Sequence, residues 1–110
     1  MQKLKNILPS LKEKKRYISF HVTGTQEQDV KNVQEAIDAG VLNFLGEYGT
    51  AQAGTQVLME SSTQGIVKVH PAYTAQTITA LALIHHIHTD PVRISTIRTS
   101  GILAKSKRRN

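Results

Sequence analysis

The fold of this chain is decided by residues 12–22, which read KEKKRYISFHV. The stretch begins as a cationic run and continues as an alternating sequence that is typical of a half-buried strand. Successive side chains of a strand point to opposite faces. The apolar face would hold Ile18, Phe20 and Val22, and the opposite face Tyr17, Ser19 and His21. One segment therefore supplies a core element and brings positive charge to one end of it.

The last part of the chain has the same arrangement in reverse order. A strand-like run over residues 92–99 carries Arg93 and Arg98 and continues into a basic tail. We predict that the two basic ends of the chain lie side by side and together bind a polyanion. The basic residues of the tail are Lys105, Lys107, Arg108 and Arg109.

The composition fits one small domain. The chain has 110 residues, 39% of them hydrophobic, and no cysteine, which is enough to build a single core. Without cysteine there are no disulfides or thiolate metal sites, and we expect a cytoplasmic location. No apolar run approaches the roughly 18 residues of a membrane span, and no apolar segment follows the first lysines as in a secretory signal. We therefore expect no membrane partner.

The charge is segregated along the chain. Residues 1–16 carry a net charge of +5, residues 17–89 carry −4, and residues 90–110 carry +5. Clustering at both ends predicts a localised surface for phosphates. Two alternatives are a pair of disordered basic tails that only aid solubility, and binding to an anionic membrane surface. The membrane alternative is weaker, because neither basic end is a long amphipathic helix.

The expected order of elements is strand, helix, strand, strand, helix, strand. Capping patterns, glycines and prolines set the boundaries. The first helix has an apolar stripe of Val30, Val33, Ile37, Val41, Phe44 and Tyr48. The second is expected to bury Tyr73, Ala80, Ile84 and Ile87. The boundaries are a strand at 15–23, a helix from 25 to Gly46 or Gly49, strands at 54–61 and 66–70, a helix from Pro71 to about His88, and a strand at 92–99.

This order predicts an α+β fold, a ferredoxin-like or RRM-like βαββαβ sandwich. Its four-stranded antiparallel sheet would carry two long helices on one face and leave the other face open. The first and last strands are neighbours in this topology, which would bring the two basic ends together. We divide the chain into a flexible basic arm (1–9), a ferredoxin-like domain (10–104) and a basic tail (105–110).

The open face offers little for base stacking. RNA-recognition domains stack bases on aromatic side chains of their two central strands. Here the strand at residues 66–70 has no aromatic residue, so Tyr17 is the one candidate, unless it is simply a half-buried structural tyrosine. If RNA is the ligand, phosphate contacts should outweigh base reading. A mainly apolar open face would instead dock another protein.

We predict no catalytic residue and no metal site. His85 and His88 lie one turn apart on the expected helix, next to His86, and could share a metal ion, but no further ligand is evident. We interpret all three as cations that suit the C-terminal end of the helix. An acylphosphatase-like site would need an arginine in the loop at residues 23–26, which read TGTQ. Paired carboxylates for acid–base or two-metal chemistry are also lacking.

Five short segments carry a family resemblance. They are residues 11–20 (LKEKKRYISF), 45–49 (LGEYG) with Ala53 and Gly54, 65–70 (GIVKVH), 80–84 (ALALI) and 97–102 (IRTSGI). In this order, and over residues 10–106, they resemble archaeal ribonuclease P protein component 2.

The resemblance implies an RNA-binding protein subunit of the ribonucleoprotein that matures tRNA 5′ ends. In that family the RNA subunit is catalytic, and the protein supports its fold and its use of Mg²⁺. The implied partners are ribonuclease P RNA, protein component 3 and the other protein subunits, and precursor tRNA in the holoenzyme. Mg²⁺ is expected on the RNA, and no cofactor on the protein. The alternative is a ferredoxin-like protein-interaction or regulatory module without an RNA role.

The resemblance and the charge pattern together predict RNA contact over residues 10–104 and the basic tail. The predicted contacts are Lys12, Lys14, Lys15, Arg16, Tyr17, Lys68, Arg93, Arg98, Lys105, Lys107 and Arg108.

Overall fold

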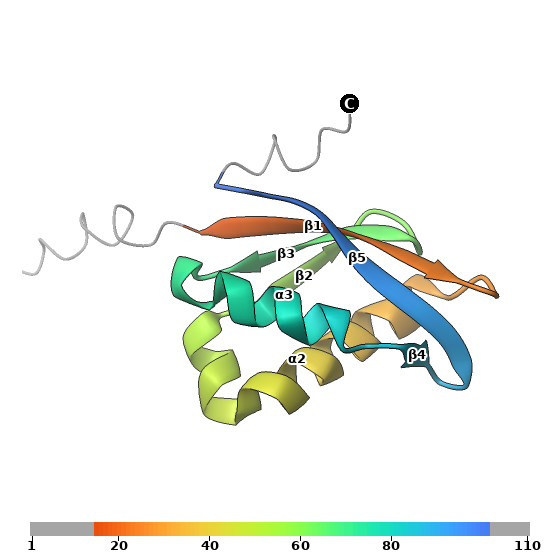
Figure 1. The fold of residues 1–110 in the computed structure, drawn as a ribbon, viewed down its shortest axis with the longest axis horizontal. Helices are drawn as coiled ribbons and strands as arrows, with labels where there is room; N and C mark the ends of the chain where they lie inside the picture. The colour runs from red at the N-terminus through yellow and green to blue at the C-terminus, as the bar shows by residue number, and fades with distance from the viewer. Residues whose placement is uncertain (1–14, 102–110) are drawn as a thin grey trace, which may run out of the picture.

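The computed structural model describes residues 15–101 as one antiparallel sheet with two α-helices (Figure 1), which confirms the α+β class. In chain order the elements are β1 (Arg16–Gly24), α2 (Val30–Ala53), β2 (Gln56–Met59), β3 (Gln64–Val69), the 3₁₀ turn η1 (Pro71–Tyr73), α3 (Thr74–Ala82), β4 (His86–Ile87) and β5 (Asp90–Ser100).

β1 lies at the centre of the sheet, whose strand order is β2-β3-β1-β5-β4. The first and last long strands are neighbours, as predicted, because β1 pairs with β5 along one side and with β3 along the other. The predicted count of four strands is wrong, since β4 pairs with the start of β5 and adds a fifth. The sheet is curled, and β5 bends across one side of the molecule (Figure 1).

A bulge adjusts the pairing of β1 with β5. Ser19 lies opposite Arg98, but the next residue, Phe20, lies opposite Thr96, so Ile97 is the extra residue. Such a bulge bends the strand and re-aims the side chains that follow it.

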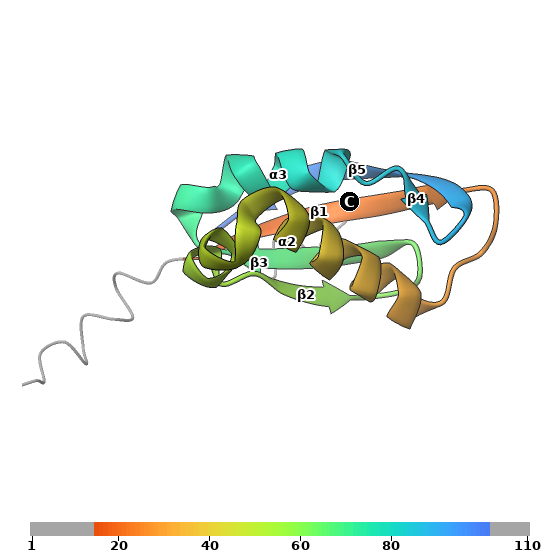
Figure 2. The ribbon, with the colours of Figure 1, turned by 90° about the horizontal axis from the view of Figure 1, so that it is seen from below.

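Both helices lie on the same side of the sheet, α2 over β2 and β3 and α3 over β1 and β5 (Figure 2). The predicted end of α2 at Gly46 or Gly49 is wrong, because the helix continues to Ala53. Gly46 (φ 81°) kinks the helix, which then resumes and ends at Gly54 in the left-handed conformation (φ 58°). Positions with positive φ favour glycine, because glycine has no Cβ.

The predicted capping box at residues 25–28 does not cap α2. The N-cap residue is Asp29, which makes no side-chain cap hydrogen bond. Instead, Thr25 Oγ1 donates to Asp90 Oδ1 (2.5 Å) and Gln28 Nε2 donates to Asp90 Oδ2 (2.6 Å). The loop before α2 is thus tied to the start of β5 through a buried carboxylate.

The apolar stripe of α2 is buried only in its middle. Val33, Ile37 and Val41 are buried, whereas Phe44 is 44% exposed and Tyr48 is 77% exposed. Val30, at the other end of the stripe, is also exposed. The kink at Gly46 changes the direction of the helix, so Tyr48 no longer continues the line of the buried residues.

The second helix is shorter than predicted. α3 has 9 residues and ends at Ala82, so the expectation of two long helices is wrong. The backbone of His85 accepts a hydrogen bond from Val92 N–H (3.0 Å), and strand pairing at β4 takes the place of the last helical turns. Of the four residues predicted to be buried, Ala80 and Ile87 are buried, while Tyr73 and Ile84 are partly buried.

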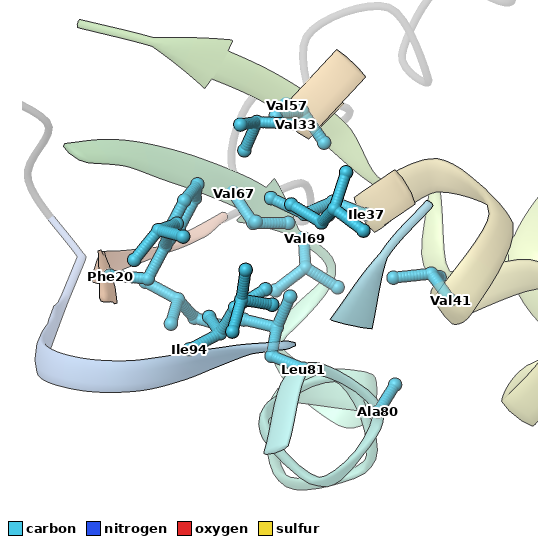
Figure 3. Close-up of a cluster of buried hydrophobic side chains, with 14 of the residues drawn as sticks. Phe20, Val33, Ile37, Val41, Val57, Val67, Val69, Ala80, Leu81 and Ile94 are labelled. Carbon is cyan, nitrogen blue, oxygen red and sulfur yellow. The ribbon is translucent and has the colours of Figure 1, made fainter. Parts of the chain in front are cut away.

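The core fills the space between the helices and the inner face of the sheet (Figure 3). Phe20 is its largest fully buried side chain, and a Cβ built on Gly65 of β3 would lie 2.7 Å from Phe20 Cζ. Gly65 therefore leaves the room that the ring occupies. Around them, β1 supplies Ile18 and Val22, β3 supplies Val67 and Val69, α2 supplies Val33, Ile37 and Val41, and α3 supplies Ala80 and Leu81.

Within residues 15–101, no helix has the length and hydropathy needed to cross a membrane.

Candidate nucleic-acid interface

The side of the sheet turned away from the helices, here called the open face, is organised by β1. Since Ile18, Phe20 and Val22 point into the core, the alternate residues of β1 point to the open face. Strand pairing extends each of them into a row across the sheet. The rows are Tyr17 with Lys68 and Ser100, Ser19 with Ile66 and Arg98, and His21 with Gln64 and Ser95.

The open face is basic. Lys68 on β3 and Arg98 on β5 flank β1 from its two sides, one row apart. None of the strand residues that point to this face in the part of the chain described is acidic. The acidic residues of that part lie in the loop before α2, on α2, in the β2–β3 turn and at the buried start of β5, and they are Glu27, Asp29, Glu35, Asp38, Glu47, Glu60 and Asp90.

The two ends of the described chain meet at one end of this face. Tyr17, near the start of β1, is the partner of Ser100, near the end of β5. Arg16 lies against Gly101, where a Cβ would come within 3.0 Å of Arg16 Nη1. The strand pairing thus brings the start of β1 and the end of β5 together. The basic runs that adjoin these two positions in the sequence, residues 12–14 and 105–109, lie outside the described residues.

The predicted contact residues fall into four groups. Tyr17, Lys68 and Arg98 share the open face, and Lys15 and Arg16 lie at its end. Arg93 pairs with Thr23, six residues along β1 from Tyr17, which is about 20 Å away at the rise of a strand. Arg93 is therefore not brought together with the others. The predicted residues outside the described range are Lys12, Lys14, Lys105, Lys107 and Arg108.

Lys15 extends toward the C-terminal end of α2. A Cβ built on Gly54, the C-cap of that helix, would lie 4.0 Å from Lys15 Nζ. A cation near a helix C-terminus is favourable because the last carbonyl groups carry partial negative charge. The Lys15 ammonium thus lies at the edge of the basic area, beside the helix.

The end of the sheet near Arg93 has a polar hollow of about 380 Å³, lined by His21, Thr23, Thr25 and Thr63 among others. No arginine is among the residues that line it. The hollow was not predicted from the sequence, because its residues come from the end of β1, the β1–α2 loop, the β2–β3 turn and Val92 of β5. Only the pairing of the strands brings these two loops together.

Tyr17 is the one aromatic residue among the paired strand positions of the open face. The apolar residues of its central row are Ile66, which is only 2% exposed, and its partner Leu58 on β2, which is 36% exposed. Base–aromatic stacking needs a free ring face. An RNA on this surface would therefore contact it mainly through phosphates.

The three histidines are not arranged as on the expected helix. His86 belongs to β4, and His88 follows it with φ 58°. His85 and His86 are in contact, with ring nitrogens 3.3 Å apart. Between residues 15 and 101, no group of three or more histidine, aspartate or glutamate side chains is placed to hold a metal ion.

Comparisons with known proteins extend these observations. The family model described as the Rpp14/Pop5 family matches residues 16–110. The chain is 31% identical over 107 residues to ribonuclease P protein component 2 of Pyrococcus furiosus, covering 96% of this chain and 89% of the relative. It is 32% identical over 110 residues to the protein of that name from Thermococcus gammatolerans, covering 98% and 92%.

Among solved structures, the chain resembles part of the yeast ribonuclease MRP structure determined by cryo-electron microscopy. The TM-score is 0.54 at 16% identity, covering 81% of this chain and 75% of that chain. At this identity the likeness concerns the fold.

Proposed function

The chain belongs to the Rpp14/Pop5 family, and we propose on this premise that it is an RNA-binding protein subunit of ribonuclease P, the ribonucleoprotein that matures tRNA 5′ ends. The observation that carries this conclusion is the family match over residues 16–110, together with relatives named ribonuclease P protein component 2 that align over nearly their whole length. The alternative of an interaction module without an RNA role is not favoured by these relatives.

The open face is the RNA-binding surface in this proposal. Lys68 and Arg98 are held on strands that flank β1, and no acidic strand residue shares that face in the described range. Cationic side chains on a rigid sheet neutralise phosphates and release counterions. The proposed contacts are those predicted from the sequence: Lys12, Lys14, Lys15, Arg16, Tyr17, Lys68, Arg93, Arg98, Lys105, Lys107 and Arg108.

The role of the protein is electrostatic rather than chemical. Reducing the repulsion among RNA phosphates lets the catalytic RNA reach its active fold, with its Mg²⁺ sites, at a lower concentration of added Mg²⁺. The RNA carries out the cleavage, and the metal ions are bound on the RNA. The protein partners are component 3 and the other protein subunits, with precursor tRNA in the assembled particle and a cytoplasmic location.

The fold that presents this surface is a ferredoxin-like βαββαβ sandwich with β4 as an added edge strand. Its strand order, with the first strand between the third and the last, supports this assignment. In this view residues 10–104 form the RNA-binding domain, and the basic segments on either side extend it.

A reconstitution experiment tests the proposal. Ribonuclease P RNA and the remaining protein subunits of an archaeal enzyme are assembled with and without this chain, and precursor tRNA cleavage is measured against Mg²⁺ concentration. We expect the chain to lower the Mg²⁺ concentration at half-maximal cleavage, and the protein without RNA to cleave nothing. An unchanged Mg²⁺ dependence, or cleavage by the RNA-free protein, would contradict the proposed role.

A pull-down separates this role from the alternative. The tagged chain is recovered from native extract with and without ribonuclease treatment, and the RNA that accompanies it is sequenced. We expect ribonuclease P RNA to accompany the chain in the untreated sample. Recovery of protein partners alone, with no such RNA, would favour an interaction module.

A further inference from the structure

The strongest feature that the proposed RNA role leaves unused is a groove in the helical layer. The groove has a volume of about 590 Å³ and runs between α2 and the segment that joins α3 to β4. It lies on the side of the molecule opposite the open face, because both helices cover the other face of the sheet (Figure 2). A molecule in this groove would not compete with RNA on the open face.

Small and apolar residues line the groove. Ala36 and Gly40 of α2 are among them, and a Cβ on Gly40 would lie 2.5 Å from Ile84 Cδ1. This contact shows how closely α2 approaches the segment after α3. The walls are Phe44 and Leu83, which are 44% and 56% exposed. Apolar side chains this exposed on both sides of one groove are typical of a docking site.

The charge around the groove differs from that of the open face. No lysine or arginine lines it; its ionisable residues are Glu35 on the α2 side and His85, His86 and His88 on the other side. α2 as a whole carries Glu35, Asp38 and Glu47 against a single base, Lys31. Along the α2 side of the groove, a polyanion such as RNA would therefore be repelled, whereas a cationic partner would be attracted.

We infer that this groove is the docking site for an amphipathic α-helix of another protein subunit, one with an apolar stripe flanked by lysine or arginine. The lining residues of α2 run from Asn32 to Phe44, about 18 Å at the rise of a helix, which matches roughly three turns of a bound helix. The apolar stripe of the partner packs between Phe44 and Leu83, and a basic side chain faces Glu35. This is the helix-in-groove mode of recognition. The inference rests on the proposed function, because it assigns a surface to the protein partners of that complex.

The test uses the whole chain and the recombinant protein subunits of an archaeal ribonuclease P, mixed without RNA, with affinity measured by titration. Phe44→Glu and Leu83→Glu place a charge on opposite walls of the groove. Leu42→Glu is the matched control, since Leu42 is a 43% exposed residue of α2 that does not line the groove. All four proteins are compared by circular dichroism and by their affinity for ribonuclease P RNA.

We expect both groove variants to bind the protein subunits at least tenfold more weakly than the wild type, with unchanged RNA affinity, and Leu42→Glu to behave as the wild type. A second arm tests the sign of the charge. Glu35→Lys should weaken binding severalfold, whereas Glu47→Lys, on the same helix but outside the groove, should not.

Three outcomes would overturn the inference. Groove variants that bind the protein subunits as the wild type does would remove the docking site, and a gain of affinity in Glu35→Lys would reverse the assigned charge of the partner. Self-association of the wild type that Leu83→Glu abolishes would make a second copy of this chain the occupant. If the wild type binds ribonuclease P RNA and the groove variants bind the protein subunits as tightly as the wild type does, only this inference is contradicted. A wild type that binds neither RNA nor subunits contradicts the proposed function and the inference together.

Discussion

The open face of the sheet and the outer side of α2 differ in charge although one core supports both. The strands carry Lys68, Arg98 and, at the far end, Arg93 on the open face and no acidic residue there, whereas α2 presents Glu35, Asp38 and Glu47 with only Lys31 to balance them. The two surfaces lie on opposite sides of a two-layer sandwich, which has the sheet on one side and both helices on the other (Figure 1).

This difference is what the two proposed binding roles of the domain require. In β1 every second residue points outward, and in α2 the outward residues follow the period of the helix. The two outward sets therefore come from different sequence positions and can be selected independently. The sheet carries the cations that a polyanion needs, while the helical layer keeps carboxylates and exposed apolar groups that a protein can cover.

The largest effect is expected from a substitution in the hydrophobic core, which supports both surfaces. Phe20 is fully buried between them, so Phe20→Ala should lower the free energy of unfolding by about 3–5 kcal/mol. Urea denaturation followed by circular dichroism measures the loss. RNA binding and subunit binding should both decline with it. If the variant had the same urea midpoint of unfolding as the wild type, the core around Phe20 would not be what supports both surfaces.

Reversing charge on one surface only should separate the two. The double change Lys68→Glu and Arg98→Glu should weaken binding to ribonuclease P RNA at least about tenfold at 0.15 M salt, because two phosphate contacts become repulsive. Lys31→Glu on α2 is the control and should change RNA affinity little. The measurement is a filter-binding titration at several salt concentrations. An equal loss in the Lys31 variant would mean that net charge, not the open face, determines binding.

A smaller effect is expected at the far end of the open face. Arg93 pairs with Thr23, away from the row that holds Arg98, so Arg93→Ala should weaken RNA binding by about threefold or less. Its effect should add to that of Arg98→Ala, because well-separated sites act independently. The two single variants and the double variant are compared in the same titration. Strong non-additivity would indicate that both arginines contact one phosphate group.

The smallest effect concerns the acidic surface of α2. Desolvation by partial burial raises the pKa of Asp38 above 3.8. A carboxyl group whose pKa is raised by folding binds its proton more tightly in the folded state, so its charged form destabilises the fold at neutral pH. The loss of stability is absent well below pH 3.8 and develops as the pH rises from 3.8 through the raised pKa of Asp38. Asp38→Asn should stabilise the protein at pH 7 by less than about 0.5 kcal/mol, because solvent screens the exposed group.

The measurement is the thermal unfolding midpoint of the wild type and the Asp38→Asn variant at pH 7 and at pH 3. Asp38→Asn should raise the unfolding midpoint at pH 7 and leave it unchanged at pH 3, where the carboxyl group is protonated in both the folded and the unfolded state. A larger gain at pH 3 than at pH 7 would contradict the assigned direction of the shift.

Much of the sheet could be predicted from local patterns. The alternation around Phe20 correctly predicts both the first strand and its inward face, and the strand–helix order correctly predicts that β1 and β5 are neighbours. These features depend on residues close together in the sequence, or on a topology with few alternatives.

The errors occur where contacts distant in the sequence replaced local preference. The segment from Leu83 to His88 was predicted as helix, but β4 pairs with the start of β5 instead, and Ile87 is buried there. The capping pattern at Thr25 and Gln28 was also predicted to serve α2, yet both side chains bind Asp90, which is more than 60 residues away. Local propensity is a weak determinant when such a partner is available.

The alternation over residues 17–22 was enough to predict which side chains of the first strand face inward, and the order of the residues shows that positive charge gathers at the two ends of the chain. Which basic residues share one end of the open face depends on how the strands pair. The tertiary structure sets Lys68 opposite Tyr17 and Arg98 opposite Ser19, leaves Arg93 at the far end, and forms the groove between α2 and Leu83. The physical reason is that register and helix packing depend on the fit of the whole core, and a slip of one residue would turn every outward side chain inward.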